Sequence, residues 1–451
     1  MDKIYGINTP LLALTTKRSA GNGEFLDLLP LIDWCQRVGL KVIQLLPLND
    51  SGLDPSPYNA LSSVALNPIY ISLHALIDHR LSHYNTTSRV DYRRLYPLKE
   101  EMLLAYADKQ KHNHPHFQNF LKEHPWSLEY GHFKDPAAAE SHAFIQLLAH
   151  EQLNQVKAYA EQRGVQLMGD IPILISRDSH DVRDHPAIFD RDLAVGTPPD
   201  IYAADGQAWE FPLLDWDAMA DRNYAWWAQR LKVAENYYHY FRIDHAVGFY
   251  RFWAYPQGEK ASTGRFIPQD PTNWVAHGER NLQGILAYTH MIPIAEDLGD
   301  DVPLDVKQSL LDQRIHLNKV IRWESVPPSD YPHLSLATVS THDTETLRQW
   351  WTNHPEEAHT YCHLMNRPYT PTPPLFDLLR DSNQSASHLT INLFQETLTL
   401  LPAYHFPNPD DERINIPGTL SPTNWIFRYK QPLEHITADS KLAALFLSGQ
   451  A

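Results

Sequence analysis

The stretch PLIDWCQRVGLKVIQLLPL (residues 30–48) decides the fold class. Its first part has apolar residues at helical spacing, and Gly39 stands where the C-terminus of a helix is expected. Residues 42–48 then form a short apolar run, which is typical of a strand buried on both faces. A helix that leads directly into a buried strand indicates a parallel sheet with helices packed against it.

The same order of helix and strand recurs along the chain. Residues 145–162 place apolar side chains near one helical face, Gly164 ends that segment, and residues 165–173 follow as a predicted strand. Further predicted strands are 237–243, 291–295, 319–323 and 336–339. We therefore predict an α/β protein with a (β/α)8 (TIM) barrel. A doubly wound sheet is the alternative, and the absence of a glycine-rich phosphate loop after these strands disfavours it.

Three segments do not follow this alternation of helix and strand, namely approximately residues 49–141, 176–221 and 344–387. We expect residues 1–451 to form a single catalytic barrel, in which these insertions cover the face formed by the carboxyl ends of the strands. Within the second insertion, residues 196–212 are predicted to be a loop. No internal repeat or flexible interdomain linker is recognisable in the sequence.

Composition narrows the classes of function. The formal net charge of −16 disfavours a nucleic-acid or anionic-membrane partner. Two cysteines exclude a disulfide framework, and the sequence shows neither a signal peptide nor an apolar stretch long enough to cross a bilayer. We therefore expect a cytoplasmic enzyme. The 12 Trp and 22 Tyr suit either sugar binding or an aromatic-rich core.

Acidic residues lie at or just after the ends of several predicted strands. Asp170, Asp244, Glu296 and Asp343 are such residues, and the carboxyl ends of the strands in a barrel meet on one rim. A retaining glycoside-cleaving enzyme needs one carboxylate as nucleophile and a second as general acid/base, about 5 Å apart. The sequence therefore favours chemistry on a glycosidic bond. A single aspartate at a strand end is more often a turn or helix cap, so the argument depends on the combination.

Two expectations concern the protonation of these groups. Arg242 lies two residues before Asp244 and so on the same face of its strand, where it would keep that carboxylate ionised. Glu296 must carry a proton to act as the acid, and we expect a desolvated setting that raises its pKa.

Motifs along almost the whole chain resemble the 4-α-glucanotransferase family (amylomaltase, or disproportionating enzyme; glycoside hydrolase family 77). These motifs are PLLAL (10–14), LLPLN (45–49), SPY (56–58), LNP (66–68), GDIP (169–172), PPD (198–200), GQAW (206–209), DWD (215–217), RIDH (242–245), AEDLG (295–299), THD (341–343), NIPGT (415–419) and NW (424–425).

The resemblance implies an enzyme that transfers α-1,4-glucan segments to the 4-hydroxyl of glucose or of another α-1,4-glucan, acting on maltooligosaccharides without a metal or organic cofactor. It implies that Asp244 is the nucleophile, Glu296 the acid/base and Asp343 the residue that stabilises the transition state. The implied substrate-binding residues are Tyr58, Asp170, Asp200, Gln207, Trp209, Arg242, His245 and His342. Asp200, Gln207 and Trp209 belong to a loop that arches over the cleft in this family.

The sequence departs from the family pattern around the subsites. Ala246-Val247 replaces the usual Phe-Arg, Glu210-Phe211-Pro212 replaces Gly-Asn-Pro, and Thr344 replaces Asn. The glycine-rich approach to the sixth strand reads HLNK (316–319). The catalytic trio is intact, so these changes concern the preference for donor and acceptor rather than the reaction.

Two other functions use the same residues. An α-glucan hydrolase would share the first half of the mechanism, and a lid that excludes water argues for transfer instead. A glycan-binding protein without activity is disfavoured because all three carboxylates are retained. Trp209 and Tyr202 are candidate sugar-stacking faces of the lid, and a structural role for Trp209 is the alternative.

Smaller signals point elsewhere. His112, His114 and His116 form a local cluster that we interpret as a solvated loop rather than a metal site. The acidic run at residues 178–185 is expected to serve turns and caps. No Gly-x-Ser-x-Gly nucleophile elbow occurs. The sequence does not indicate an oligomeric state.

Overall fold

Eight parallel strands, taken in chain order, form one sheet whose two edges meet. In the computed structural model, which describes residues 2–77, 81–199, 204–299 and 302–449, the strand order is β10-β11-β12-β1-β2-β3-β6-β9. An isolated parallel bridge between Ile294 and His316 joins the β9 and β10 edges. These strands are β1 (Ile4–Thr9), β2 (Val42–Leu45), β3 (Gln166–Ile171), β6 (Tyr240–Ile243), β9 (Ile292–Ala295), β10 (Leu317–Val320), β11 (Ser335–Thr338) and β12 (Leu389–Leu393).

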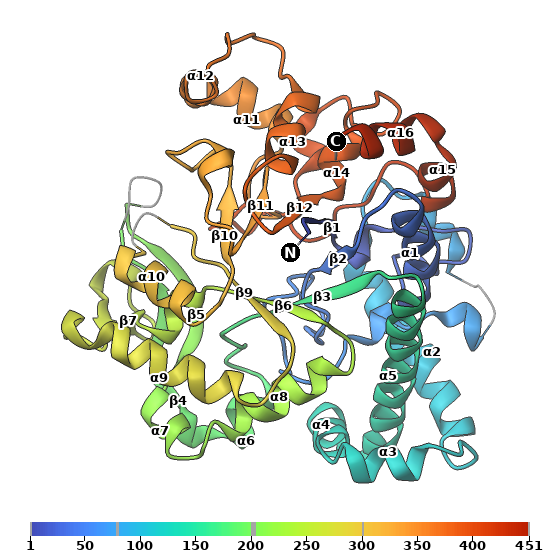
Figure 1. The fold of residues 1–451 in the computed structure, drawn as a ribbon. Helices are drawn as coiled ribbons and strands as arrows, with labels where there is room; N and C mark the ends of the chain where they lie inside the picture. The colour runs from blue at the N-terminus through green and yellow to red at the C-terminus, as the bar shows by residue number, and fades with distance from the viewer. Residues whose placement is uncertain (1, 78–80, 200–203, 300–301, 450–451) are drawn as a thin grey trace.

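This cyclic order confirms the predicted barrel, because a doubly wound sheet reverses its strand order at a switch point. Figure 1 shows the strands at the centre of the molecule with the helices around them. The described helices are α1 (Leu28–Arg37), α2 (Tyr92–Gln110), α3 (Phe117–Glu123), α4 (Trp126–Lys134), α5 (Ala139–Gln162), α6 (His180–Asp184), α7 (Trp216–Ala220), α8 (Ala225–Glu235), α9 (Trp274–Leu286), α10 (Leu304–Asp312), α11 (Leu347–Asn353), α12 (Pro355–Leu364), α13 (Leu375–Asn383), α14 (Phe394–Leu398), α15 (Leu433–Ala438) and α16 (Ser440–Gly449).

The interior of the barrel is filled by one apolar cluster. Its members come from seven of the eight strands: Ile4, Val42, Met168, Tyr240, Ile294, Leu336, Leu389 and Ile391. Side chains alternate along a strand, so residues two positions further on point the same way. Asp170 lies two residues after Met168, and Arg242 lies two residues after Tyr240, so their side chains point the same way as these core residues. The core of the barrel therefore continues into a polar layer at the carboxyl ends of the strands.

Two helices end as their glycines predict. Gly164, with φ of 64°, follows α5, and the N–H of Val165 donates to the carbonyl of Ala160 over 2.9 Å. Gly39, with φ of 80°, ends α1 in the same way. This six-to-one bond and the left-handed glycine define a Schellman motif, which turns the chain from the helix into the next strand.

The predicted strand bounds were too long or shifted. The strand predicted at 42–48 ends at Leu45, although Leu46 and Leu48 are buried as well. Buried loop residues extend the apolar runs beyond the hydrogen-bonded ladder, and apolarity alone does not separate the two. β10 begins before the predicted 319–323, and β1 and β12 were not predicted at all.

The three segments outside the alternation have structures of their own. Residues 49–141 contain 3-10 turns and α2 to α4, and residues 344–387 contain α11 to α13. Residues 176–221 contain the antiparallel pair β4 (Phe189–Thr197) and β5 (Gln207–Leu214), so residues 196–197 and 207–212 of the expected loop at 196–212 are strand. With β7 (Phe252–Pro256) and β8 (Arg265–Ile267), the pair forms a second sheet that the sequence did not predict. In Figure 1 these segments lie on different sides of the barrel.

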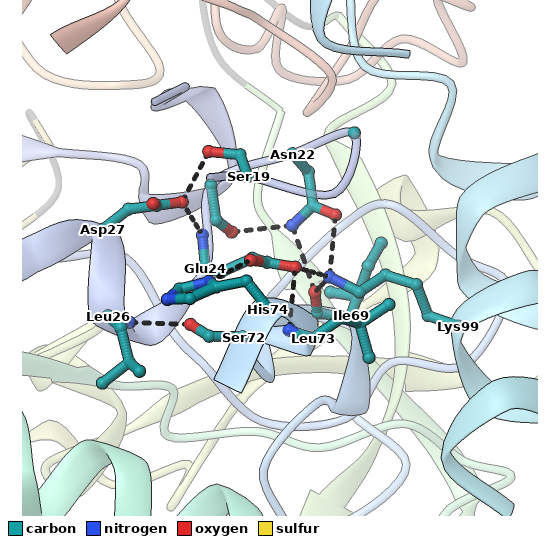
Figure 2. A network of polar contacts seen from close by, with 12 residues as sticks. Ser19, Asn22, Glu24, Leu26, Asp27, Ile69, Ser72, Leu73, His74 and Lys99 are labelled. Atoms are coloured by element: carbon teal, nitrogen blue, oxygen red, sulfur yellow. Dashed lines mark hydrogen bonds and ion pairs between the residues drawn. The ribbon is translucent and has the colours of Figure 1, made fainter. Parts of the chain in front are cut away.

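A buried ion pair ties α2 to the start of the chain (Figure 2). The Lys99 ammonium group of α2 donates to Glu24 Oε1 over 2.6 Å, to the carbonyl of Ile69 over 2.6 Å and to Asn22 Oδ1 over 3.3 Å. The Lys99 and Glu24 side chains are fully buried.

Within the described residues, no helix is both long enough and apolar enough to cross a membrane.

Candidate active site

The strand ends bring the predicted charged residues together. Asp170 in β3 and Arg242 in β6 are partners in the parallel ladder and point into the same layer. Asp244 directly follows β6, and Glu296 directly follows β9, the next strand of the barrel. Four ionisable groups from three neighbouring strands therefore meet at one rim.

Arg242 is the centre of this group. One amino group of its guanidinium, Nη1, donates to both oxygens of Asp170 over 2.8 and 2.7 Å and to Asp244 Oδ1 over 3.0 Å. The other, Nη2, forms an ion pair with Glu296 Oε1 at 2.5 Å. Asp170 is fully buried, whereas Asp244 and Glu296 keep side-chain exposures of 23% and 21%. The two proposed reacting carboxylates are thus the accessible ends of a buried network.

The pKa expectations for these two carboxylates were wrong. Burial raises the pKa of Asp244 well above its usual range, and the neighbouring carboxylates add to this against the opposing charge of Arg242. For Glu296, burial also acts upward, but Arg242 and the backbone N–H of His245 outweigh it and lower the pKa. The reason is the division of the guanidinium: Asp244 shares Nη1 with Asp170, while Glu296 is paired with Nη2.

Asp343 lies on the other side of the site, in the loop after β11. His342 Nε2 lies 3.3 Å from Asp343 Oδ2, and Asn415 Nδ2 donates to Asp343 Oδ1 over 2.7 Å. Burial would raise the pKa of Asp343, but His342, Asn415 and Arg242 together hold it at about 2. With 39% of its side chain exposed, Asp343 offers a permanent negative charge to a ligand.

Tyr58 connects the two sides. Its hydroxyl donates to Asp170 Oδ2 over 2.8 Å and lies 2.9 Å from His342 Nε2. The rings of Tyr58 and His342 are stacked at 5.3 Å, and Trp425 packs on both. A continuous chain of contacts therefore runs from Glu296 through Arg242 to Asp170. Tyr58 and His342 extend it to Asp343.

The second sheet reaches the site through Trp209. The Trp209 and His245 rings are perpendicular, with centroids 4.8 Å apart, and the backbone N–H of His245 donates to Glu296 Oε2 over 2.8 Å. The side chain of Gln207 accepts the Trp209 indole N–H over 3.3 Å. Asp200 and Tyr202 lie outside the described residues.

Sequence reasoning missed two polar residues that hold the Asp343 loop. Asn415, quoted only as part of a motif, bonds the Asp343 carboxylate. Glu396 lies in α14, directly after the unpredicted strand β12, and accepts the Ser340 hydroxyl over 2.6 Å. An alternating pattern in LTINL (389–393) was the available signal for that strand.

The secondary signals have local partners. His114 Nε2 and His116 Nδ1 lie 3.6 and 3.0 Å from oxygens of Glu151 in α5, so each can form an ion pair with it when protonated. In the acidic run, Asp181 accepts the Trp226 indole N–H over 2.7 Å and the backbone N–H of Ser63 over 2.9 Å. Asp181 thus has a structural role, whereas the ligand atoms of His114, His116 and Glu151 lie within 4.8 Å of one another, so the interpretation of these histidines as a solvated loop stays a prediction.

A (β/α)8 barrel with carboxylates on neighbouring strand ends, one arginine among them and an aromatic side chain against the rim is the arrangement expected of retaining enzymes that act on glycosidic bonds. The comparisons with known proteins define the family. The sequence pattern of the family described as 4-alpha-glucanotransferase matches residues 9–137 and 134–434. This chain belongs to the 4-alpha-glucanotransferase family.

Individual relatives agree with this assignment. The 4-alpha-glucanotransferase of Chlamydia muridarum is 36% identical over 504 aligned residues, covering 98% of this chain and 94% of the relative. That of Chlamydia pneumoniae is 38% identical, covering 97% and 93%. Among solved structures, the amylomaltase from Streptococcus agalactiae in complex with acarbose has a TM-score of 0.84 at 23% identity, covering 100% of this chain and 99% of that chain. The last comparison supports the fold.

Proposed function

We propose that this protein moves α-1,4-glucan segments from a donor to the 4-hydroxyl of glucose or of another α-1,4-glucan by a retaining double displacement. The observation that carries the proposal is the shared guanidinium of Arg242, which holds Asp244 and Glu296 on two adjacent amino groups. Two partly exposed carboxylates held side by side suit attack on one anomeric carbon and protonation of its leaving oxygen.

In the first step Glu296 protonates the glycosidic oxygen while Asp244 attacks C1, and the reducing-end fragment leaves. In the second step Glu296 removes the proton of the acceptor hydroxyl, which displaces Asp244 from C1 with net retention. Asp343 remains ionised throughout and binds sugar hydroxyls while positive charge develops on the sugar ring.

The donor itself has to shift the pKa values in this site. In the free protein the pKa of Asp244 is raised and that of Glu296 is lowered, whereas the first step needs an ionised Asp244 and a protonated Glu296. A bound glucan presents the lone pair of its glycosidic oxygen to Glu296, which stabilises the protonated form. Its hydroxyls donate to Asp244, which stabilises the carboxylate.

We further propose that the three insertions cover the carboxyl-end face of the barrel and that β4, β5 and their connection act as the lid. The contact of Trp209 with His245, beside Asp244, supports this placement. A dry site favours an oriented sugar over water as the acceptor. For location we propose the cytoplasm, which the two buried free thiols, Cys35 and Cys362, support.

The test is incubation with maltotriose. Transfer yields glucose and longer oligomers with no net gain of reducing ends, hydrolysis raises the number of reducing ends, and a binding protein leaves maltotriose unchanged. We expect transfer from the wild type. Asp244→Asn should lower turnover by several orders of magnitude but still bind maltooligosaccharide, because it removes the nucleophile and keeps the shape of the site. Near-normal turnover in this variant would exclude Asp244 as the nucleophile.

A further inference from the structure

Strand β5 contains an irregularity at Trp209 and Glu210. The ladder pairs on its two sides are Val195–Phe211 and Gly196–Ala208. Two residues of β5 are therefore inserted where β4 has none, which makes a bulge. A bulge bends its strand and redirects the side chains on it. Glu210 also has φ of 64°, a left-handed conformation that residues other than glycine rarely adopt.

The side chain of Glu210 is anchored on the second sheet. Its Oε1 accepts from the Tyr255 hydroxyl over 3.2 Å, and its Oε2 accepts from Gln257 Nε2 over 3.0 Å. Tyr255 is a buried residue of β7, and β4 separates this strand from β5. Hydrogen bonds to an ionised carboxylate are stronger than neutral ones. These two hydrogen bonds hold residue 210 in the left-handed backbone conformation, which glycine would adopt without strain.

Arg177 holds the same bulge from its backbone. Its guanidinium donates to the carbonyl of Glu210 over 3.3 Å, to that of Arg191 over 2.6 Å and to that of Leu193 over 3.1 Å. Arg191 and Leu193 belong to the irregular part of β4, between its ladder residues Asp190 and Ala194. One side chain thus bonds three carbonyls at the two places where the β4–β5 ladder is interrupted.

The bulge determines where Trp209 lies. Its ring stands perpendicular to that of His245, and the His245 N–H is bonded to Glu296. We propose that Glu210 is a positioning residue, which locks the bulge so that Trp209 and His245 form a fixed wall of the site beside Glu296. The family pattern usually has a glycine here, which reaches this conformation unaided. In this chain an anchored carboxylate takes its place.

This inference rests on the proposed transferase function and predicts a shift from transfer to hydrolysis. Glu210→Gly keeps the left-handed backbone accessible but removes both side-chain bonds. We expect the ratio of hydrolysis to transfer on maltotriose to rise about fivefold or more, the value of losing one or two hydrogen bonds. KM for a glucose acceptor should rise more than kcat falls. Glu210→Gln retains an acceptor for the Tyr255 hydroxyl, so its ratio of hydrolysis to transfer should lie between those of the wild type and Glu210→Gly.

Glu259→Gln is the matched control, because Glu259 is an exposed carboxylate in the turn that follows β7 of the same sheet and lies outside the proposed lid. We expect wild-type kinetics from it. Equal thermal stability of Glu210→Gly and wild type would show that the hairpin still folds. A wild-type product ratio and acceptor KM in Glu210→Gly would overturn the inference.

The pH profile separates positioning from a general structural role. The His245 N–H lowers the pKa of Glu296, so a displaced His245 raises that pKa. The alkaline limb of kcat/KM should then move to higher pH in Glu210→Gly, since Glu296 acts in its protonated form. The other groups that face Glu296 are retained in every variant: Arg242, Asp244, His342 and Asp343. An unmoved limb contradicts the inference, whereas hydrolysis alone from the wild type contradicts the transferase function.

Discussion

At the scale of single residues, Glu396 holds together the loop that carries His342 and Asp343. Its Oε1 accepts the Ser340 hydroxyl at one end of the loop over 2.6 Å and the backbone N–H of Leu347 at the other end over 3.0 Å. The residue is fully buried. Burial raises its pKa to about 7, and these two bonds oppose that rise only in part.

We predict that Glu396 makes stability depend on pH. Its pKa is raised in the folded chain, so its contribution to stability is present below its ordinary pKa of 4.5 and is lost as pH rises through about 7. By pH 8 the loss should reach about 3 kcal/mol. Glu396→Gln removes this titration while keeping an acceptor oxygen, so wild type should fall relative to it between pH 5 and pH 8.

Urea titrations at both pH values measure the free energy of unfolding of each protein. Glu101→Gln, on the exposed face of α2, is the control and should follow the wild type at both pH values. If Glu396→Gln and wild type show the same dependence on pH, the buried carboxyl does not titrate in this range.

At the scale of elements, the glycines around β3 have separate duties. Gly164 ends α5 with a positive φ, and a Cβ placed on it would meet no atom within 4 Å. Gly169 lies inside β3, beside Asp170, and a Cβ there would come within 2.5 Å of the Tyr238 ring. The first glycine is required by backbone conformation and the second by close packing.

The two alanine variants should therefore differ. Gly164→Ala should destabilise the fold by about 1 kcal/mol, the strain of one left-handed residue, and leave kcat/KM unchanged. Gly169→Ala should destabilise it by about 1–3 kcal/mol through overpacking, and lower kcat/KM because Asp170 moves with the strand. Thermal unfolding and maltotriose kinetics measure both effects. A kinetic defect in Gly164→Ala would contradict this division.

At the scale of the whole molecule, the Lys99–Glu24 pair fastens the helical insertion to the barrel (Figure 2). We predict that Lys99→Met destabilises the protein by about 3–5 kcal/mol, because it removes the closer cation from the buried Glu24 carboxylate and leaves His74, 3.9 Å away, as its ionisable partner. Adding Glu24→Gln should recover part of this loss. Lys260 forms an ion pair with Asp205, and both side chains are 72% exposed. Lys260→Met should therefore change the free energy of unfolding by less than about 0.5 kcal/mol. Comparable losses in Lys99→Met and Lys260→Met would contradict this account.

Much of the fold was predictable because its signals are local. Apolar runs marked six of the eight barrel strands, and Gly39 and Gly164 marked two helix ends, since only a residue that tolerates positive φ suits that place. β1 and β12 were missed, and so was the second sheet. In the second sheet, β4 and β5 precede β6 in the sequence and β7 and β8 follow it, so the pairing of β4 with β7 joins segments that are far apart in the chain.

The sequence predicted which charged residues meet at the strand ends, but it did not predict the pKa shifts of Asp244 and Glu296. Asp244, Glu296, Asp343 and Arg242 were recognised from strand ends and motifs, and the structure brings them together. The direction of the pKa shift of each carboxylate depends on burial and on how one guanidinium is divided among Asp170, Asp244 and Glu296. Asn415 was missed as a partner of Asp343 because 72 residues separate the two.

The sequence by itself determined the order of helices and buried strands, the places where helices stop and the residue types at the strand ends, because periodicity and backbone preference act over a few residues. Only the tertiary structure decided the cyclic closure of the sheet, the bulge that turns Trp209 toward His245, and the opposite pKa shifts of Asp244 and Glu296. These depend on burial and on charges within a few ångströms, and such distances are set by packing between segments far apart in the chain.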